Sequence, residues 1–186
     1  FFHPYQGSMY FSAARVNGLS FWEAAPYTLA GSWMWEYFME HEQPSTSDFL
    51  TTTFGGTFLG ESLYRLSNAI RNDSTSGSTR LLREIAAFAV NPVSGLDRVF
   101  TGKAWADGPA STPVPLSMNL RVGVDGLGQP EGTGWGTTFR TRIRFDYGDP
   151  YAKSRVTTPF EVFHFALQLS VSDTIIGQGL DGIGVL

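Results

Sequence analysis

The chain has no cysteine among its 186 residues. It therefore has neither a disulfide framework nor a thiolate metal site. Charged residues make up only 16% of the chain, whereas an average soluble domain has about 25%. The formal net charge is −4, so the chain lacks the basic excess that binding to nucleic acid requires, and we expect no nucleic-acid partner.

Aromatic residues and glycine are abundant where charge is scarce. Aromatic residues make up 15% of the chain, and glycines number 21. This combination fits a membrane barrel better than a cytosolic enzyme. The chain begins at Phe1 without a methionine and ends at Leu186 inside a predicted strand. We therefore expect both ends of the protein to be missing, and a signal peptide would not be visible here.

Residues 1–102 have the apolar period of helices. Ser20 with Glu23 is a capping-box pattern, and Ser45 with Asp48 is a second one. The Gly55-Gly56 pair allows a close backbone approach or a positive φ. The predicted helices span residues 8–17, 21–41, 57–71 and 78–90, followed by a short helix capped by Ser94 and Asp97 and closed by Gly102.

The stretch 21–39 is long and apolar enough to suggest a transmembrane helix. Glu23, Pro26 and Glu36 weaken that interpretation, and they favour a helix buried inside protein. Residues 103–113, rich in glycine, proline, serine and threonine, are predicted to link the helical part to the rest of the chain.

The period changes from 3.6 to 2 after this linker. Strands are predicted at residues 114–125, 138–147, 161–172 and 175–186, each with one apolar and one polar face. Such segments, about ten residues long, are typical of transmembrane barrels. The alternative is an antiparallel sheet packed on the helices of a soluble α+β protein. The apolar faces carry Phe139, Ile143, Phe145, Phe163, Phe165, Leu167 and Leu169; the polar faces, predicted to line a lumen, carry Arg140, Arg142, Arg144, His164 and Gln168.

Residues 31–65 combine acidic residues with an arginine, tryptophans and the glycine pair in apolar surroundings. Buried charges are costly unless they are paired. Glu61 and Arg65 are four residues apart and share a helix face. We therefore predict one buried polar network drawn from Arg15, Glu36, Glu40, Glu61, Arg65, Arg83 and Glu84.

Signals for catalysis are weak. His3 with Ser8 and a nearby acid would suit a lipid hydrolase, but the chain has no G-x-S-x-G elbow. Glu36, Glu40 and Glu61 would suit a general acid and base if the fold brought them together, although a structural network is the favoured interpretation. His41 has no second histidine near it, so no metal site is predicted.

The same stretch carries no nucleotide-binding motif, but its aromatic residues suit a membrane interface. The segment from Gly55 to Glu61 lacks the lysine of a phosphate-binding loop, so no nucleotide or other cofactor is expected. Trp33, Trp35 and Tyr37 suit interfacial anchors, and core packing explains them equally well.

Several segments resemble the DUF3943 family, a bacterial domain of unknown function found in Gram-negative envelope proteins. In order along the chain they are HPYQGSMYFSAARVNG, GSWMWEYFMEHEQPSTSDFLTTTFGGTFLGESLYRLS, REIAAFAVNPVSGLDRVFTG, FDYGDP and TPFEVFHF. The resemblance covers nearly the whole chain. It implies an outer-membrane or periplasm-facing protein, longer than this chain, with a helical N-terminal part followed by β-strands. It implies no activity.

We therefore expect an α+β chain with a helical segment at 1–102, a linker at 103–113 and antiparallel strands at 114–186 that are truncated and form part of a transmembrane β-barrel. The helical segment would plug or cap this barrel on the periplasmic side of the outer membrane. The expected role is structural, or handling of lipid or a small solute, with membrane lipid as partner and no ligand identified. One alternative is a membrane-embedded lipid hydrolase using His3 or the buried carboxylates. Another is a soluble periplasmic α+β binding module.

Overall fold

The computed structural model describes residues 2–39, 43–109, 113–128, 135–151, 157–172 and 176–185. The chain divides into two compact units, Phe1–Pro113 and Val114–Leu186. All the described helices belong to the first unit and all the described strands to the second, so the fold is α+β. None of the described helices is both long and apolar enough to cross a membrane.

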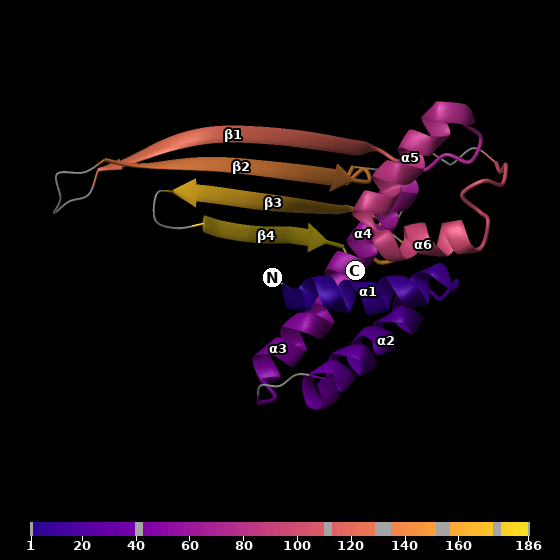
Figure 1. Cartoon of the computed structure of the whole chain (residues 1–186), viewed down its shortest axis with the longest axis horizontal. Coiled ribbons are helices and arrows are strands. Elements are labelled where there is room, and N and C mark those ends of the chain that lie inside the picture. The colour runs from indigo at the N-terminus through magenta and orange to yellow at the C-terminus, as the bar shows by residue number, and fades with distance from the viewer. Residues whose placement is uncertain are drawn as a thin grey trace. The chain divides into compact units, whose positions relative to one another are not determined.

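The helical unit contains six α-helices and two short π-helical segments among the described residues (Figure 1). The elements are α1 (Phe2–Val16), α2 (Phe21–Met34), η1 (Trp35–Met39), α3 (Thr46–Leu50), η2 (Thr51–Gly55), α4 (Gly56–Ile70), α5 (Gly77–Val90) and α6 (Pro92–Phe100). Three of the α-helices are continuous with a π-helical segment, α2 with η1 and both α3 and α4 with η2, and each segment places an extra residue in one turn.

Local capping chemistry fixes several helix starts. The Ser20 hydroxyl accepts a hydrogen bond from the Glu23 N–H, and the Glu23 carboxylate accepts one from the Ser20 N–H, which confirms the first capping box. Ser45 caps α3 by accepting from the Asp48 N–H. The predicted cap at Ser94 is wrong, because Asn91 caps α6 through its side chain and Pro92 occupies the first turn.

Two predicted helix boundaries also differ from the structure. Helix α1 begins at Phe2 rather than Ser8, since Pro4 lies in the first turn, where a missing N–H breaks no intrahelical bond. The Gly55-Gly56 pair does not interrupt the helix, because both residues have helical dihedrals, with φ of −62° and −66°. The function of Gly56 is instead to let the backbones of α1 and α4 approach each other closely.

Helix α1 is central to the helical unit, where it contacts α2, α4 and α6 (Figure 1). The Cα of Gly7 lies against Gly56, so that a Cβ on Gly56 would be 2.5 Å from it. Farther along the same contact, Gly60 faces the ring of Phe11, where a Cβ would be 2.8 Å from the Phe11 side chain. The glycines of α4 therefore let the two helix backbones touch.

The buried side chains of this unit are unusually small and polar. Phe11, Leu59 and Leu66 are buried, but so is a larger group of hydroxyl-bearing residues: Ser8, Ser12, Thr28, Ser32, Thr52, Thr53, Ser62, Ser67 and Ser94. Many other large apolar side chains of the unit are exposed. Exposed examples are Trp22, Trp33, Phe38, Phe54, Leu82, Ile85, Phe100 and Trp105. This distribution is opposite to that of an ordinary soluble helical domain.

Residues 103–108 pack on the helical unit and do not form a free linker. Arg80 donates hydrogen bonds to the carbonyl oxygens of Lys103, Ala104 and Ala106. The Gly108 N–H donates to the Asp73 carbonyl oxygen, and Ala104 is buried. The arginine thus holds the chain where it leaves α6.

The strand unit is an antiparallel meander with the order β1-β2-β3-β4 (Figure 1). Its strands are β1 (Leu116–Gly128), β2 (Trp135–Tyr147), β3 (Phe163–Ser172) and β4 (Ile176–Gly184). Within the described residues the sheet is open, with β1 and β4 at its edges. The switch from helix to strand therefore falls between Phe100 and Leu116.

The register gives the sheet two chemically different faces. Ile143 pairs with Leu120 on one side and with Leu167 on the other, and Phe145 pairs with Met118 and Phe165. The alternate positions pair Arg144 with Asn119 and Arg142 with Gln168. Because side chains alternate along a strand, the apolar residues share one face and the arginines share the other, as their spacing predicts.

Candidate functional site

Glu61 is the most deeply buried charged side chain of the helical unit, with an exposed fraction of 0%. Its Oε2 accepts from Arg15 Nε at 2.8 Å, and its Oε1 accepts from Arg65 Nε at 2.7 Å. Arg15 comes from α1, whereas Glu61 and Arg65 lie one turn apart on α4. The close approach of α1 and α4 brings the three groups together, so their pairing depends on that contact.

Arg15 is fixed by two further contacts. Its guanidinium lies over the ring of Tyr64, 4.5 Å from the ring centre, and it also donates to the Leu19 carbonyl oxygen. Both Glu61 oxygens accept hydrogen bonds from guanidinium groups. The geometry is that of a structural ion cluster.

The predicted single network is divided in the structure. Glu36, 4% exposed, accepts a hydrogen bond from the N–H of Ser45, the residue that caps α3. Arg83 donates a hydrogen bond to the carbonyl oxygen of Ile70, the last residue of α4. Glu40 lies outside the described residues. Of the described members of the predicted network, Arg15, Glu61 and Arg65 form one cluster.

Glu84 belongs to a second cluster that the sequence pattern did not reveal. Its Oε1 lies 2.8 Å from Arg98 Nη2, and the same nitrogen lies 2.6 Å from Asp73 Oδ1. Arg71, 4% exposed, completes the cluster with its Nε 3.6 Å from Glu84. Burial lowers the pKa of Arg71, and the neighbouring Glu84 carboxylate opposes that effect. Partners 14 to 25 residues apart give no local signal.

His3 and Ser8 do not form a nucleophile pair. The Ser8 hydroxyl donates to the Tyr5 carbonyl oxygen one helical turn earlier. The Nδ1 atom of His3 is buried without a hydrogen-bond partner among the described residues. Among those residues, no group of three or more potential metal ligands occurs.

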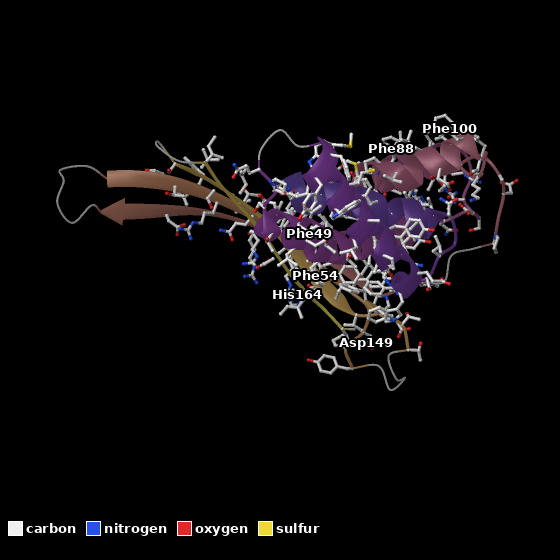
Figure 2. The ribbon with its side chains drawn as sticks, turned by 90° about the horizontal axis from the view of Figure 1, so that it is seen from below. Phe49, Phe54, Phe88, Phe100, Asp149 and His164 are labelled. Carbon is white, nitrogen blue, oxygen red and sulfur yellow. The ribbon has the colours of Figure 1, made fainter. Side chains whose placement is uncertain are left out.

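The polar face of the sheet carries a row of arginines along β2, each with an aspartate. Arg140 Nε lies 3.0 Å from Asp125 Oδ2 on β1, and Arg142 Nη2 lies 2.6 Å from Asp181 Oδ2 on β4. Arg144 pairs at 2.7 Å with Asp146 on its own strand. His164, labelled in Figure 2, stands opposite Asp146.

Glu161, just before β3, accepts four hydrogen bonds, from the N–H and hydroxyl groups of Thr157 and Thr158. The Thr158 and Thr157 hydroxyls and the Thr157 N–H favour the ionised form and lower the Glu161 pKa from 4.5 to about 2. A depressed pKa stabilises the fold above the unfolded-state value of 4.5, and this contribution is lost as the pH falls through about 2.

We therefore expect the Glu161 carboxyl to titrate near pH 2 in a side-chain carbon NMR experiment on the folded protein. Thr158→Val removes the hydroxyl that lowers the Glu161 pKa most, and it should move the midpoint up toward 4.5. Glu23, whose pKa is lowered by Ser20, is the internal control, since the Thr158 change should leave it unmoved. A wild-type midpoint near 4.5 would contradict the assigned hydrogen bonds.

Comparison with known proteins gives one match. The family model of DUF3943, a domain of unknown function, matches residues 1–93, which span α1 to α5 and the first residues of α6. The strand motifs FDYGDP and TPFEVFHF lie beyond the matched part. No curated protein and no solved structure matches the chain. The match includes Arg15, Glu61, Arg65 and the glycines between α1 and α4, and the chain belongs to the DUF3943 family.

Proposed function

We propose that this chain is part of an outer-membrane β-barrel protein with a structural, lipid-handling or small-solute role and no catalytic activity. The observation that carries the proposal is the apolar face of the sheet, which is exposed along β1. Val122 is 72% exposed, and Met118, Leu120, Val124 and Phe139 are exposed with it. An exposed apolar face of this size marks a contact with lipid or protein.

The opposite face supports lipid as that contact. Its arginines are paired with aspartates, as suits a water-filled interior. Strands β1 and β2 have 13 residues each, and about 9–11 residues are enough for a tilted strand to cross the hydrocarbon layer. In this proposal the open edges of the described sheet are completed by further strands of the barrel.

The helical unit suits a cap at the membrane interface better than a plug. A plug in a polar lumen would need a polar exterior, whereas α2 and η1 expose Trp22, Leu29, Trp33 and Tyr37. Tryptophan and tyrosine are enriched where membrane and water meet. Helices packed through small residues around buried polar groups are also typical of a lipid environment. Phe88 and Phe100, on α5 and α6, are exposed as well (Figure 2).

Single spin labels on the full protein test this proposal, and the 186 residues of this chain contribute no cysteine to background labelling. Arg121 and Val122 are neighbours on β1 and lie on opposite faces, so they are a matched pair. In lipid bilayers we expect a label at Val122→Cys to collide with oxygen, which concentrates in lipid. A label at Arg121→Cys should instead collide with a water-soluble nickel chelate.

Two other outcomes would contradict the proposal. Lipid contact at Arg121 and water contact at Val122 would mean that the faces are reversed. Water or protein contact at both positions, with migration on gels that does not change on heating and solubility without detergent, would favour the soluble periplasmic binding module. No described contact favours the lipid hydrolase, since the Glu61 carboxylate is held by two arginines.

A further inference from the structure

Arg121 and Arg142 stand directly opposite each other on β1 and β2. Like charges in such a pair are destabilising. Arg142 is compensated by Asp181, and its neighbours Arg140 and Arg144 each have an aspartate. Among the described residues, the structure gives Arg121 no ion-pair partner. The repulsion between the two guanidinium groups is therefore only partly relieved by the protein.

The surroundings of Arg121 supply space and hydrogen-bond donors. Gly123, the next residue on the same face, has nothing within 4 Å of the position of a Cβ. Asn119 precedes Arg121 on that face, and Gln168 stands opposite Arg142 on β3. Four arginines and three aspartates share this region, which leaves one positive charge in excess. The arrangement resembles a binding surface for an anion more than a closed ion-pair ladder.

We propose that Arg121 and Arg142 bind a phosphate group on the polar face of the sheet. The planar guanidinium fork matches the oxygens of a phosphate and can donate two hydrogen bonds at once. A negatively charged phosphate group between two opposed guanidinium groups replaces their repulsion with two attractions. The phosphate group belongs either to a free solute or to a lipid headgroup. The inference does not depend on the barrel, because it requires only the register of β1 and β2.

Calorimetric titration of the full, detergent-solubilised protein with inorganic phosphate tests the site. We expect saturable binding to the wild type and a loss of about tenfold or more in affinity for Arg121→Gln, which removes a charge-assisted contact. Arg140→Gln is the matched control: it removes the same charge from the same face, but from a residue that pairs with Asp125 and stands opposite Gly123, not opposite another arginine. We expect Arg140→Gln to weaken binding much less.

Stability gives a second readout. Because Arg121→Gln also removes the repulsion, the variant should unfold at the same temperature as the wild type or higher. Phosphate should raise the unfolding temperature of the wild type and of Arg140→Gln, but not that of Arg121→Gln. If Arg121→Gln proves misfolded, Arg121→Lys replaces it, since lysine keeps the charge but lacks the fork and should bind phosphate more weakly.

A titration with dispersed phosphatidylglycerol distinguishes the sources of the phosphate group. Saturable binding of inorganic phosphate, dependent on Arg121, assigns a solute; binding of the lipid alone, with the same dependence, assigns a headgroup. Absence of saturable binding to both overturns the proposal. Equal losses in Arg121→Gln and Arg140→Gln also overturn it, because they would show only the general effect of charge. The spin-label experiment on the two faces is independent of either result.

Discussion

The double variant Arg15→Met/Arg65→Met should lose roughly 3–5 kcal/mol of unfolding free energy, the cost of leaving a buried charge unpaired. Glu61 is fully buried, and the structure pairs its two oxygens with these arginines. Each single variant leaves one arginine on the carboxylate. We therefore expect each to cost about 1.5–3 kcal/mol, the range for a hydrogen bond to a charged group.

Adding Glu61→Gln to the double variant should recover much of the loss, since a neutral amide costs less to bury than an unpaired carboxylate. Urea denaturation of the full chain measures all of these free energies. Lys103→Met is the control for removal of an exposed cation: its ammonium lies 3.4 Å from Asp97 and is 55% exposed. Its loss should cost under about 1 kcal/mol. Equally small costs for the Arg15 and Arg65 changes would show that the cluster is a surface feature.

Gly56→Ala should destabilise the protein by about 1–3 kcal/mol, the usual cost of overpacking. Two effects compete at this helical position. Alanine is favoured over glycine by about 1 kcal/mol through helix propensity. The new Cβ would lie 2.5 Å from the Gly7 Cα and 2.7 Å from its carbonyl carbon. Backbone atoms cannot rotate away as a side chain can, so α1 must shift, and Arg15 shifts with it.

The same denaturation measurement tests this prediction. Gly7→Ala approaches the contact from the other helix, where a Cβ would meet the Thr52 carbonyl oxygen at 2.1 Å, and it should be at least as costly. Gly123→Ala is the control, because nothing lies within 4 Å of its Cβ position. A gain of about 1 kcal/mol for Gly56→Ala would mean that propensity alone decides, and that the helices are not in backbone contact.

Features that depend on residues a few positions apart could be predicted from the sequence. The Ser20–Glu23 capping box, the Glu61–Arg65 pair and the alternation of Arg140, Arg142 and Arg144 with apolar residues all follow from helix and strand periodicity. The change of period also predicts that strands follow helices. These predictions hold because the interacting groups are brought together by the geometry of a single element.

Contacts between elements could not be predicted in the same way. The sequence offers Arg15 and Arg83 equally as partners for Glu61, and it places Glu36 in the same network. The tertiary structure chooses Arg15, because the glycines of α1 and α4 let those two backbones meet, and it turns Glu36 to the Ser45 N–H. The composition likewise indicates that the helices are apolar, but it does not show which face of each helix is buried. Periodicity fixes the face on which a side chain lies, whereas only the packing of distant segments decides what that face contacts.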